Sequence, residues 1–277
     1  MKRKTNNMKK KVAAALAMLM AVLAVGCAGQ TEAGIQEKES LPVIVVGSDN
    51  YPPFNYVDMD GNPTGIDVEL AREAFDRMGY EAEFRQINWE DKKELLEEGE
   101  IDCIWGSFSI DGREDEYQWA GPYMMSHQVI AVRTDSDIYS LQDLEGKTVA
   151  VQSTTKPEEI FRDHEDPRVP ALGKVLSLQN RDLIYTFLSK GYADAIAAHE
   201  TAVEQFMEDY DMEYRILDEP LLTVGLGVAF DKHDDRGLAQ KLTETFEEMR
   251  QDGATEKIIR KYLSNADHYL EVHTDES

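Results

Sequence analysis

Two segments of this chain repeat one pattern, which constrains the fold more than any other feature of the sequence. In residues 96–104 and 188–196, a helical segment ends at glycine, an aspartate follows three residues later, and a short apolar strand begins. Glycine is common just past a helix end, and strands that follow helices this closely are typical of α/β folds. The chain is therefore predicted to be an α/β protein, with Ser107 and His199 at equivalent points of two similar units.

The stretch 102–123 carries the first candidate binding residues. Hydroxyl side chains, Ser107 and Ser109, follow a predicted strand over 101–105, and Arg113 is the only Lys or Arg in the stretch. Hydroxyls offer hydrogen bonds, and a guanidinium can bind a carboxylate through two parallel bonds. Because open α/β sheets bind ligands beyond the carboxyl ends of their strands, this stretch is predicted to hold a small carboxylate. A polar loop with a surface arginine is the alternative.

The first 26 residues are predicted to be a lipoprotein signal peptide. Six Lys and Arg residues precede the apolar run 12–25, which is shorter than the ~20 residues needed to span a bilayer. The run ends in residues that resemble a bacterial lipobox, with Cys27 as the lipidated residue, although Ala24 stands where leucine is commonest. A simple secretory signal and an uncleaved anchor are the alternatives, and Met8 is an alternative start.

Lipidation of Cys27 would tether the mature chain to the outer face of a membrane. Residues 27–40, which are mostly polar and have no apolar period, are predicted to be this tether. The first apolar strand of the fold is expected to begin at Leu41.

Removal of the signal leaves a strongly acidic chain. The signal contains six of the 29 Lys and Arg residues and none of the 54 Asp and Glu residues, so the mature chain carries 23 basic residues and a net charge of −31. This charge disfavours nucleic acid and anionic lipid as partners and predicts a soluble, self-repelling surface.

Cys103 is the cysteine that remains once Cys27 is assigned to lipid, and it is predicted to be a buried apolar side chain. The six histidines show no metal-ligand spacing, so no metal or cofactor is expected.

Further apolar patterns extend the alternation of strands and helices. After a predicted strand over 41–47 come Asp49 and Tyr51, and two prolines stiffen the loop that presents Tyr51. Asp67 is the predicted N-cap of one helix and Asn180 that of another. Other strands are predicted over 81–85, 129–132, 148–152 and 224–230. Helices are predicted to end at 79 and 99, to begin near 157 and 199, and to cover 238–252. The hydroxyl cluster 153–155 and the helix start that follows it offer an anion site.

In this order and spacing, the residues resemble the extracellular solute-binding proteins of ABC importers, in the polar amino-acid branch with the type II periplasmic-binding fold. The resemblance runs from about Val43 to Leu263. Its markers are Gly47…Tyr51-Pro52-Pro53-Phe54, Gly65-Ile66-Asp67, Trp89, Gly99-Glu100-Ile101-Asp102, Ser109-Ile110…Arg113, Pro122-Tyr123, Leu144-Glu145-Gly146-Lys147…Val151-Gln152-Ser153 and Gly191…Asp194-Ala195.

This resemblance implies two α/β lobes with mixed sheets, joined by crossover hinge strands. Lobe 1 would comprise 41–130 and 222–277, and lobe 2 would comprise 131–221. The implied function is an extracytoplasmic, lipid-anchored monomer, without a cofactor, that delivers an amino acid or related small carboxylate to an ABC permease.

The resemblance also implies roles for the binding residues. Tyr51 and Trp89 would enclose the solute's side chain, although Trp89 could instead be a core residue. The two serines would hydrogen-bond the solute, and Arg113 would bind its α-carboxylate with help from Thr155. The candidate ligand-binding residues are Asp49, Tyr51, Trp89, Ser107, Ser109, Arg113, Thr155, His199 and Glu200.

Two departures from the family pattern bear on the ligand. The loop before Arg113, Asp111-Gly112, is one residue shorter than usual, and His199 with Glu200 replaces the aspartate that binds the solute's ammonium group. In one alternative, the solute is an amino acid, and its ammonium group is bound by the Glu200 carboxylate or by neutral His199. In the other, the solute has no ammonium group and His199 donates to an oxygen. The intact carboxylate half of the site favours an amino acid.

Two other classes of function stay open at this point. Some relatives with this fold dehydrate cyclic acids or cleave cell-wall glycans, and Glu98 or Glu200 could act as a general acid, although no carboxylate pair stands out. A ligand-sensing module is the third possibility, disfavoured because only a short acidic tail follows the binding module.

Overall fold

The computed structural model describes residues 40–164 and 166–271. The strands are β1 (Val43–Ser48), β2 (Tyr56–Val57), β3 (Pro63–Thr64), β4 (Glu81–Gln86), β5 (Cys103–Ser109), β6 (Gln118–Arg133), β7 (Thr148–Gln152), β8 (Lys174–Leu178), β9 (Ala195–His199), β10 (Tyr214–Ile216) and β11 (Leu222–Phe230). The helices are α2 (Ile66–Met78), α3 (Lys92–Glu97), α4 (Lys156–Asp163), α5 (Asp182–Ser189), α6 (Glu200–Tyr210), α7 (Leu238–Gln251), α8 (Ala254–Ile259) and α9 (Asp267–Leu270), with 3-10 helices η1 (Trp89–Asp91) and η2 (Leu141–Leu144). This alternation confirms the α/β prediction.

One large mixed sheet carries the fold, in the order β4-β1-β5-β11-β6-β9-β7-β8, with β10 beside β6. Strands β4, β1 and β5 are parallel and form what we call the first sheet half. Strands β9, β7 and β8 are also parallel and form the second sheet half. Between the halves, β11 and β6 pair antiparallel with each other and with the strands beside them, so they join both halves into one sheet.

The pairing register brings the carboxyl ends of the two halves together. Ser109, the last residue of β5, pairs with Leu226 of β11, and Leu226 pairs with Met124 of β6. His199, the last residue of β9, pairs with Gln128 of β6, four residues farther along the same strand. The two parallel groups therefore run toward each other and end at the middle of β6, which is where ligands are expected in such sheets.

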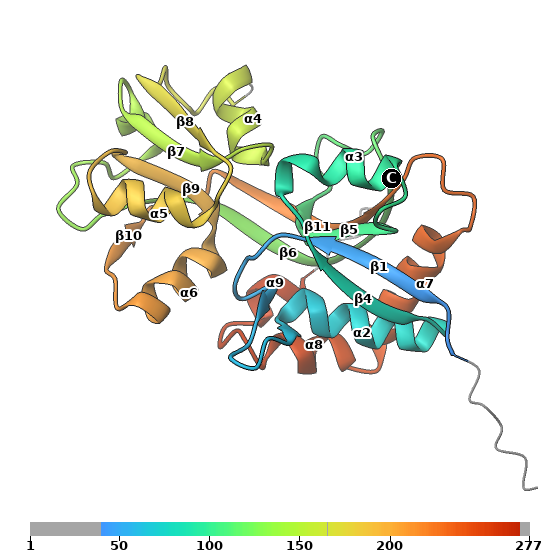
Figure 1. The fold of residues 1–277 in the computed structure, drawn as a ribbon. Helices are drawn as coiled ribbons and strands as arrows, with labels where there is room; N and C mark the ends of the chain where they lie inside the picture. The colour runs from blue at the N-terminus through green and yellow to red at the C-terminus, as the bar shows by residue number, and fades with distance from the viewer. Residues whose placement is uncertain (1–39, 165, 272–277) are drawn as a thin grey trace, which may run out of the picture. The chain divides into compact units, whose positions relative to one another are not determined.

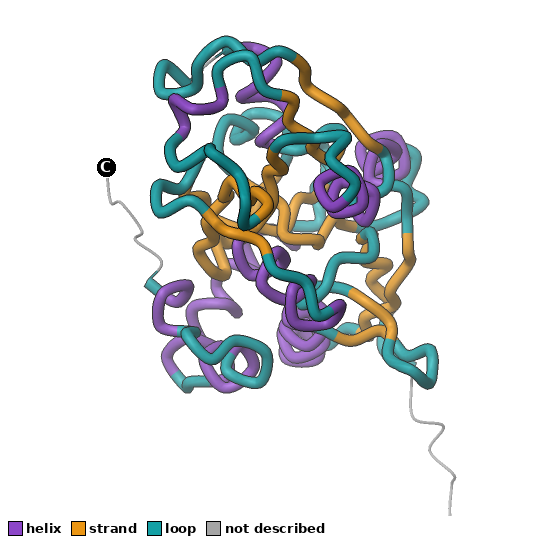
Figure 2. Tube along the Cα trace, turned by 90° about the vertical axis from the view of Figure 1, so that its left-hand side faces the viewer, coloured by secondary structure: helices purple, strands orange, loops and turns teal. Residues whose placement is uncertain are grey.

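Apolar residues on both faces of the sheet explain why these strands are buried. Helices α2 and α7 cover one face of the first half, where Phe75 and Phe246 pack edge-to-face on Trp105 of β5, and α8 packs against both helices (Figure 1). Along β6, Ile130 and Val132 belong to one core cluster of the second half, whereas Val129 and Ala131 belong to another. The two clusters lie on opposite faces, because side chains alternate across a strand. Figure 2 shows helices on either side of the strands.

The repeated sequence pattern corresponds to a repeated structural unit. The backbone N–H of Val45 in β1 donates to the Asp102 carboxylate at 2.8 Å, and the backbone N–H of Thr148 in β7 donates to Asp194 at 2.8 Å. In return, the backbone N–H of each aspartate donates to the carbonyl of the same partner residue. Each aspartate therefore locks the strand that follows it to its parallel neighbour.

Several predicted boundaries need correction. Asp67 is not an N-cap, because α2 begins at Ile66 and its N-cap is Gly65, with φ 118°. A side chain at Gly65 would also lie 2.2 Å from the carbonyl oxygen of Phe54, so glycine is required there. Strand β5 extends to Ser109, β6 is 16 residues long, and β8 and β10 were not predicted. The N-cap of α5 is Arg181 and not Asn180, although the Asn180 side chain accepts a hydrogen bond from the backbone N–H of Asp182.

The predicted signal peptide, the tether and Cys27 lie outside the described residues, apart from Ser40. Among the helices of the described residues, none is long and apolar enough to cross a membrane. Cys103 is fully buried on β5, and this burial raises the pKa of its thiol well above the usual value.

Candidate functional site

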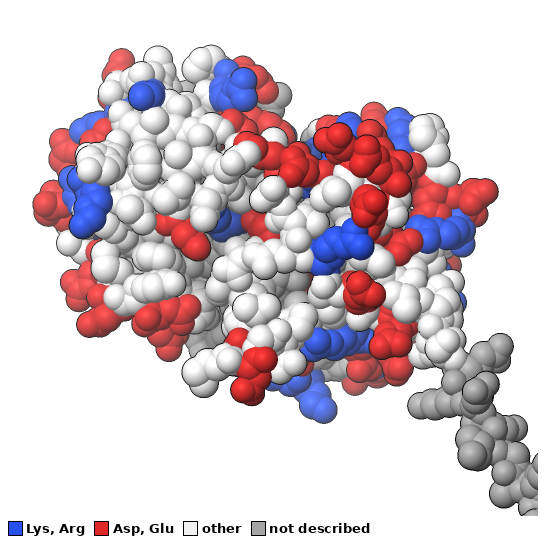
Figure 3. All heavy atoms as spheres, in the orientation of Figure 1, with Lys and Arg blue, Asp and Glu red and all other residues white. Residues whose placement is uncertain are grey.

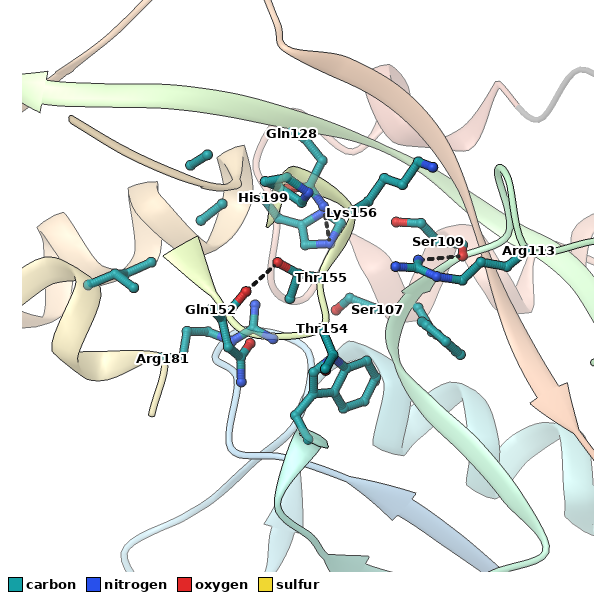
Figure 4. Close-up of a pocket in the computed structure, with 17 residues that line it drawn as sticks. Ser107, Ser109, Arg113, Gln128, Gln152, Thr154, Thr155, Lys156, Arg181 and His199 are labelled. Atoms are coloured by element: carbon teal, nitrogen blue, oxygen red, sulfur yellow. Dashed lines mark hydrogen bonds between the residues drawn. The ribbon is translucent and has the colours of Figure 1, made fainter. Parts of the chain in front are cut away.

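A cavity lies where the strand ends meet. Residues from the ends of β5, β7 and β9, the middle of β6, η1 and the start of α5 surround it, with an empty volume of about 410 Å³ that includes its open mouth (Figure 4). The lining residues are Trp89, Gly106, Ser107, Phe108, Ser109, Arg113, Gln128, Gln152, Thr154, Thr155, Lys156, Pro157, Arg181, Ile184, Ala197, Ala198 and His199.

Arg113 follows β5 and lies at one side of this cavity (Figure 4). Its side chain is only 6 % exposed, its guanidinium lies over the Phe108 ring at 5.2 Å, and its Nη1 donates to the Ser109 carbonyl at 3.4 Å. Its Nη2 forms an ion pair with Glu159 of α4, which also pairs with Lys156 at 3.3 Å. The arginine is therefore held in a fixed position by the ring below it and by a carboxylate beside it.

Arg181 lies at the opposite side of the cavity and was not predicted as a site residue (Figure 4). Its guanidinium carbon lies 3.1 Å from the centroid of the Tyr51 ring, and its Nη2 donates to Asp49 at 3.2 Å. Gln152 also donates to the Asp49 carboxylate, at 2.8 Å. Asp49 and Tyr51 therefore lie behind Arg181 and do not line the cavity.

Trp89 serves both the cavity and the core. It lines the cavity, yet it is 4 % exposed and packs edge-to-face on Phe108 at 5.3 Å. The Lys92 ammonium lies 4.8 Å from the Trp89 ring and donates to the Thr154 hydroxyl at 2.8 Å. Burial first, and then the charge of Arg113, lower the pKa of Lys92 to about 8. A side chain at Gly106 would lie 3.1 Å from Trp89, so glycine allows the indole to pack closely there.

The ring of His199 is fully engaged by protein partners. Nδ1 lies 2.8 Å from the Ser126 hydroxyl, and Nε2 lies 2.9 Å from the Gln128 amide nitrogen. Burial, followed by the charge of Arg181, lowers the pKa of His199 to about 3, so the ring is neutral near pH 7. A neutral imidazole has one donor and one acceptor, and both are used.

Glu200 is turned away from the cavity. Its carboxylate accepts a hydrogen bond from the Tyr269 hydroxyl of α9 at 2.9 Å, and it is not a lining residue. As the first residue of α6, it follows His199 directly, but the helical turn directs its side chain elsewhere.

Ser107 lies at the centre of the site in an unusual backbone conformation. Its φ is 50°, in the left-handed region, and its backbone N–H donates to the buried Asp67 carboxylate at 2.8 Å. Asp67 also accepts from Asn55 and from the Tyr123 hydroxyl. Burial raises the pKa of Asp67 to about 7, opposed by these hydrogen bonds. The Ser107 hydroxyl is buried without a protein partner and lines the cavity.

The structure brings together six of the nine candidate residues. Trp89, Ser107, Ser109, Arg113, Thr155 and His199 line the cavity, whereas Asp49, Tyr51 and Glu200 do not. The Thr155 hydroxyl donates to the Gln152 carbonyl at 2.6 Å, so in this structure its hydrogen is already used.

Sequence reasoning missed several polar lining residues, notably Gln128, Gln152 and Arg181. Gln152 could have been found, because it ends the predicted strand 148–152 and precedes the hydroxyl cluster. Arg181 follows a predicted helix cap, and no local pattern distinguishes it from a surface arginine.

The cavity is rich in hydrogen-bond donors and positive charge. Among the described residues that line it, three are cationic (Arg113, Lys156 and Arg181) and none carries a carboxylate. The described part of the chain also contains no group of three or more His, Cys, Asp or Glu residues that could hold a metal ion. Such a lining suits a small anionic molecule.

Comparison with known proteins gives consistent matches over most of the chain. A model of the bacterial extracellular solute-binding proteins, family 3, matches residues 43–265. The histidine-binding periplasmic protein of Salmonella typhimurium is 30% identical over 264 residues, which cover 92% of this chain and 97% of the relative. The structure of an ancestral arginine-binding protein bound to arginine superposes with a TM-score of 0.72 at 26% identity, covering 80% of this chain and 98% of that one.

A further structural match bears on enzymatic activity. An ancestral amino acid-binding protein, described as a precursor of cyclohexadienyl dehydratase, superposes with a TM-score of 0.70 at 26% identity. The match covers 79% of this chain and 95% of that one.

Proposed function

Because this chain belongs to the bacterial extracellular solute-binding proteins, family 3, we propose that it captures a small carboxylate solute for an ABC permease. Its fold is the two-lobed type II periplasmic-binding fold. The solute class proposed here comprises amino acids and related small acids, since relatives are named for binding histidine and arginine.

The observation that carries this proposal is the position of Arg113. It is a nearly buried guanidinium at a cavity formed where parallel strands end, with Ser107 and Ser109 beside it. Charge-assisted bonds from a guanidinium in a water-poor site are among the stronger contacts a small carboxylate can make. The Glu159 carboxylate that pairs with Arg113 gives an internal example of such a contact.

Movement of two lobes is part of the proposal. Lobe 1 would contain residues 41–130 and 222–277, and lobe 2 residues 131–221, with β6 and β11 passing between them. The cavity is lined from both parts: Ser107 and Arg113 come from the first, and Thr155 and Arg181 from the second. Separation of the parts would open the cavity to solvent, and closure would enclose the solute.

The proposed location is the outer face of the cell membrane. Residues 1–26 would be removed as a signal peptide, and lipid on Cys27 would hold the mature chain, as a monomer, near its permease. The lipobox-like residues before Cys27 support this part of the proposal.

An enzyme on the same fold is the second candidate, because one structural match is a dehydratase precursor. Two observations weigh against it. Among the described residues, the cavity lining has no carboxylate to serve as a general acid, and both ring nitrogens of His199 are engaged. Incubation with candidate acids, followed by mass spectrometry, distinguishes turnover from binding.

The test of the proposal is a thermal-shift panel of small acids on the mature chain and on Arg113→Ala. A ligand at 100-fold its Kd should stabilise the native state by about 2.7 kcal/mol. Loss of a desolvated charge pair costs about 2–5 kcal/mol, so Arg113→Ala should weaken binding at least about 30-fold. Arg113→Lys should restore only part of the affinity, because an ammonium lacks the two-pronged geometry. Normal binding by the alanine variant would remove Arg113 from the site.

A further inference from the structure

The cavity raises the question of which small acid it accepts, and the answer rests on the proposed function. A free α-amino acid brings an ammonium group as well as a carboxylate. An ammonium group enclosed away from water is costly unless an anion or several acceptors surround it. The side chains near His199 therefore decide whether an amino acid can be bound well.

Neither residue at this position offers an anion. The His199 ring is neutral, and its two nitrogens are already bonded to Ser126 and Gln128. The Glu200 carboxylate is bonded to Tyr269 and does not line the cavity. Neutral acceptors are present, because the amide oxygens of Gln128 and Gln152 and the hydroxyl oxygen of Ser107 are buried without protein partners. They can accept from a hydroxyl group, but they do not neutralise a cation.

Positive charge is found on both sides of the cavity. Arg113 and Arg181 lie on opposite sides, and the buried Nε of Arg181 has no protein partner (Figure 4). Among the described residues of the lining, the charged side chains are the cations Arg113, Lys156 and Arg181, and none is a carboxylate. The carboxylates Asp49, Asp67, Glu158 and Glu159 bond to lining residues from behind and are not lining residues themselves.

We propose that this site takes a small dicarboxylate that lacks an ammonium group, with one carboxylate at Arg113 and the other at Arg181. The two carboxylates of the ligand would face the arginines on the two sides of the cavity, whose described lining residues include no carboxylate. A hydroxyl group in place of the ammonium can donate to the unpartnered amide oxygen of Gln128 or Gln152. The orphan hydroxyl of Ser107 supplies a further donor between the two arginines.

The test uses pairs of acids that differ only in the group at issue. Isothermal titration of the mature chain compares malate with aspartate and 2-hydroxyglutarate with glutamate, with lactate as the single-carboxylate control. We expect each hydroxy-dicarboxylate to bind at least about tenfold more tightly than its amino counterpart and than lactate, a difference of about 1.4 kcal/mol or more. Equal or tighter binding of the amino acids overturns this inference but leaves the proposed function in place. Equal binding of lactate overturns the requirement for two carboxylates.

Two variants extend the test. His199→Asp puts an anion where the ammonium group of an amino acid would lie, so the variant should gain affinity for aspartate or glutamate and lose affinity for the hydroxy acids. Glu200→Gln is the matched control on the neighbouring residue and should leave the preference unchanged. If Glu200→Gln instead abolishes amino-acid binding, Glu200 is the ammonium partner and the inference is wrong. If none of these or other small acids binds the wild-type chain, the proposed function itself fails.

Discussion

The guanidinium carbon of Arg181 lies over the ring of Tyr51, 3.1 Å from its centroid, and the same guanidinium pairs with Asp49. The aromatic face expected to contact a solute is therefore covered by a cation from 130 residues farther along the chain. Asp49 and Arg181 are both more than nine-tenths buried, so each depends on the other for charge compensation. This dependence can be measured.

Arg181→Gln should destabilise the ligand-free protein by about 3–5 kcal/mol, because it leaves the Asp49 carboxylate buried without a cation. The double variant Asp49→Asn/Arg181→Gln should recover a large part of that loss, because the buried charge is then gone. Urea unfolding of the wild type, both single variants and the double variant measures the coupling. Strictly additive losses would mean that the pair contributes no net interaction.

Glu159→Gln should tighten the binding of a small acid, because the internal carboxylate no longer competes for Arg113. Glu159 is about one-third exposed, and such pairs are worth up to about 1 kcal/mol, so the gain should not exceed about fivefold. Ligand titration of Glu159→Gln and of the double variant Arg113→Ala/Glu159→Gln tests whether the increase in affinity acts through Arg113. In the Arg113→Ala background, Glu159→Gln should cause no increase in affinity. A loss of affinity in the single variant would show that Glu159 positions Arg113.

Trp89→Ala should lower the stability of the ligand-free protein by about 3–5 kcal/mol, as expected for a large aromatic side chain removed from a packed cluster. Trp89→Phe should cost much less, because the buried indole N–H has no protein partner to lose. The melting temperatures of both variants without ligand provide the measurement. An unchanged melt for the alanine variant would make Trp89 a wall of the cavity and not part of the core.

Asp67 should make stability fall as the pH rises from about 4 to 7. Burial raises its pKa to about 7 in the folded state, above the ordinary value of 3.8. The folded state therefore holds this proton where the unfolded state has lost it, and the contribution of Asp67 disappears as pH passes through 7.

Asp67→Asn should remove this dependence, so the stability of the wild type relative to the variant should decrease by at most about 4 kcal/mol between pH 4 and 7. Urea unfolding at several pH values gives the difference. A difference that stays constant, or rises with pH, would show that the hydrogen bonds from Ser107 and Tyr123 keep the carboxylate ionised.

Cys27→Ser should release the protein from the membrane fraction and leave a precursor with the signal still attached. Multiple acylation is expected at this cysteine, since one acyl chain anchors only marginally. Fractionation of cells that express wild type or variant, with mass spectrometry of the N-terminus, is the measurement. Unchanged membrane association of the variant would contradict the lipobox interpretation.

Features formed by consecutive residues could be predicted from the sequence, whereas features formed by distant segments could not. The serines at the end of β5 and the arginine that follows it could be found, because small hydroxyl residues and a cation close to an apolar strand are a contiguous pattern. The pairing of Arg181 with Tyr51 could not, because it depends on two distant loops and on the register of the sheet. Similarly, only the apolar run 129–132 near the end of β6 was predicted as a strand. In the structure, Pro122 lies opposite the register shift between Leu226 and Val228, where a missing backbone N–H is tolerated.

The cavity lining is cationic, whereas the chain as a whole is acidic and many Asp and Glu side chains lie on its surface (Figure 3). This contrast has a kinetic consequence. An anionic solute that approaches this chain first meets a repulsive long-range field and is attracted only near Arg113 and Arg181. Salt screens the field over about 8–10 Å at ordinary ionic strength, which weakens the distant repulsion more than the short-range attraction. The association rate constant should therefore increase with added salt while the dissociation rate changes little, the reverse of the usual behaviour of electrostatically steered ligands.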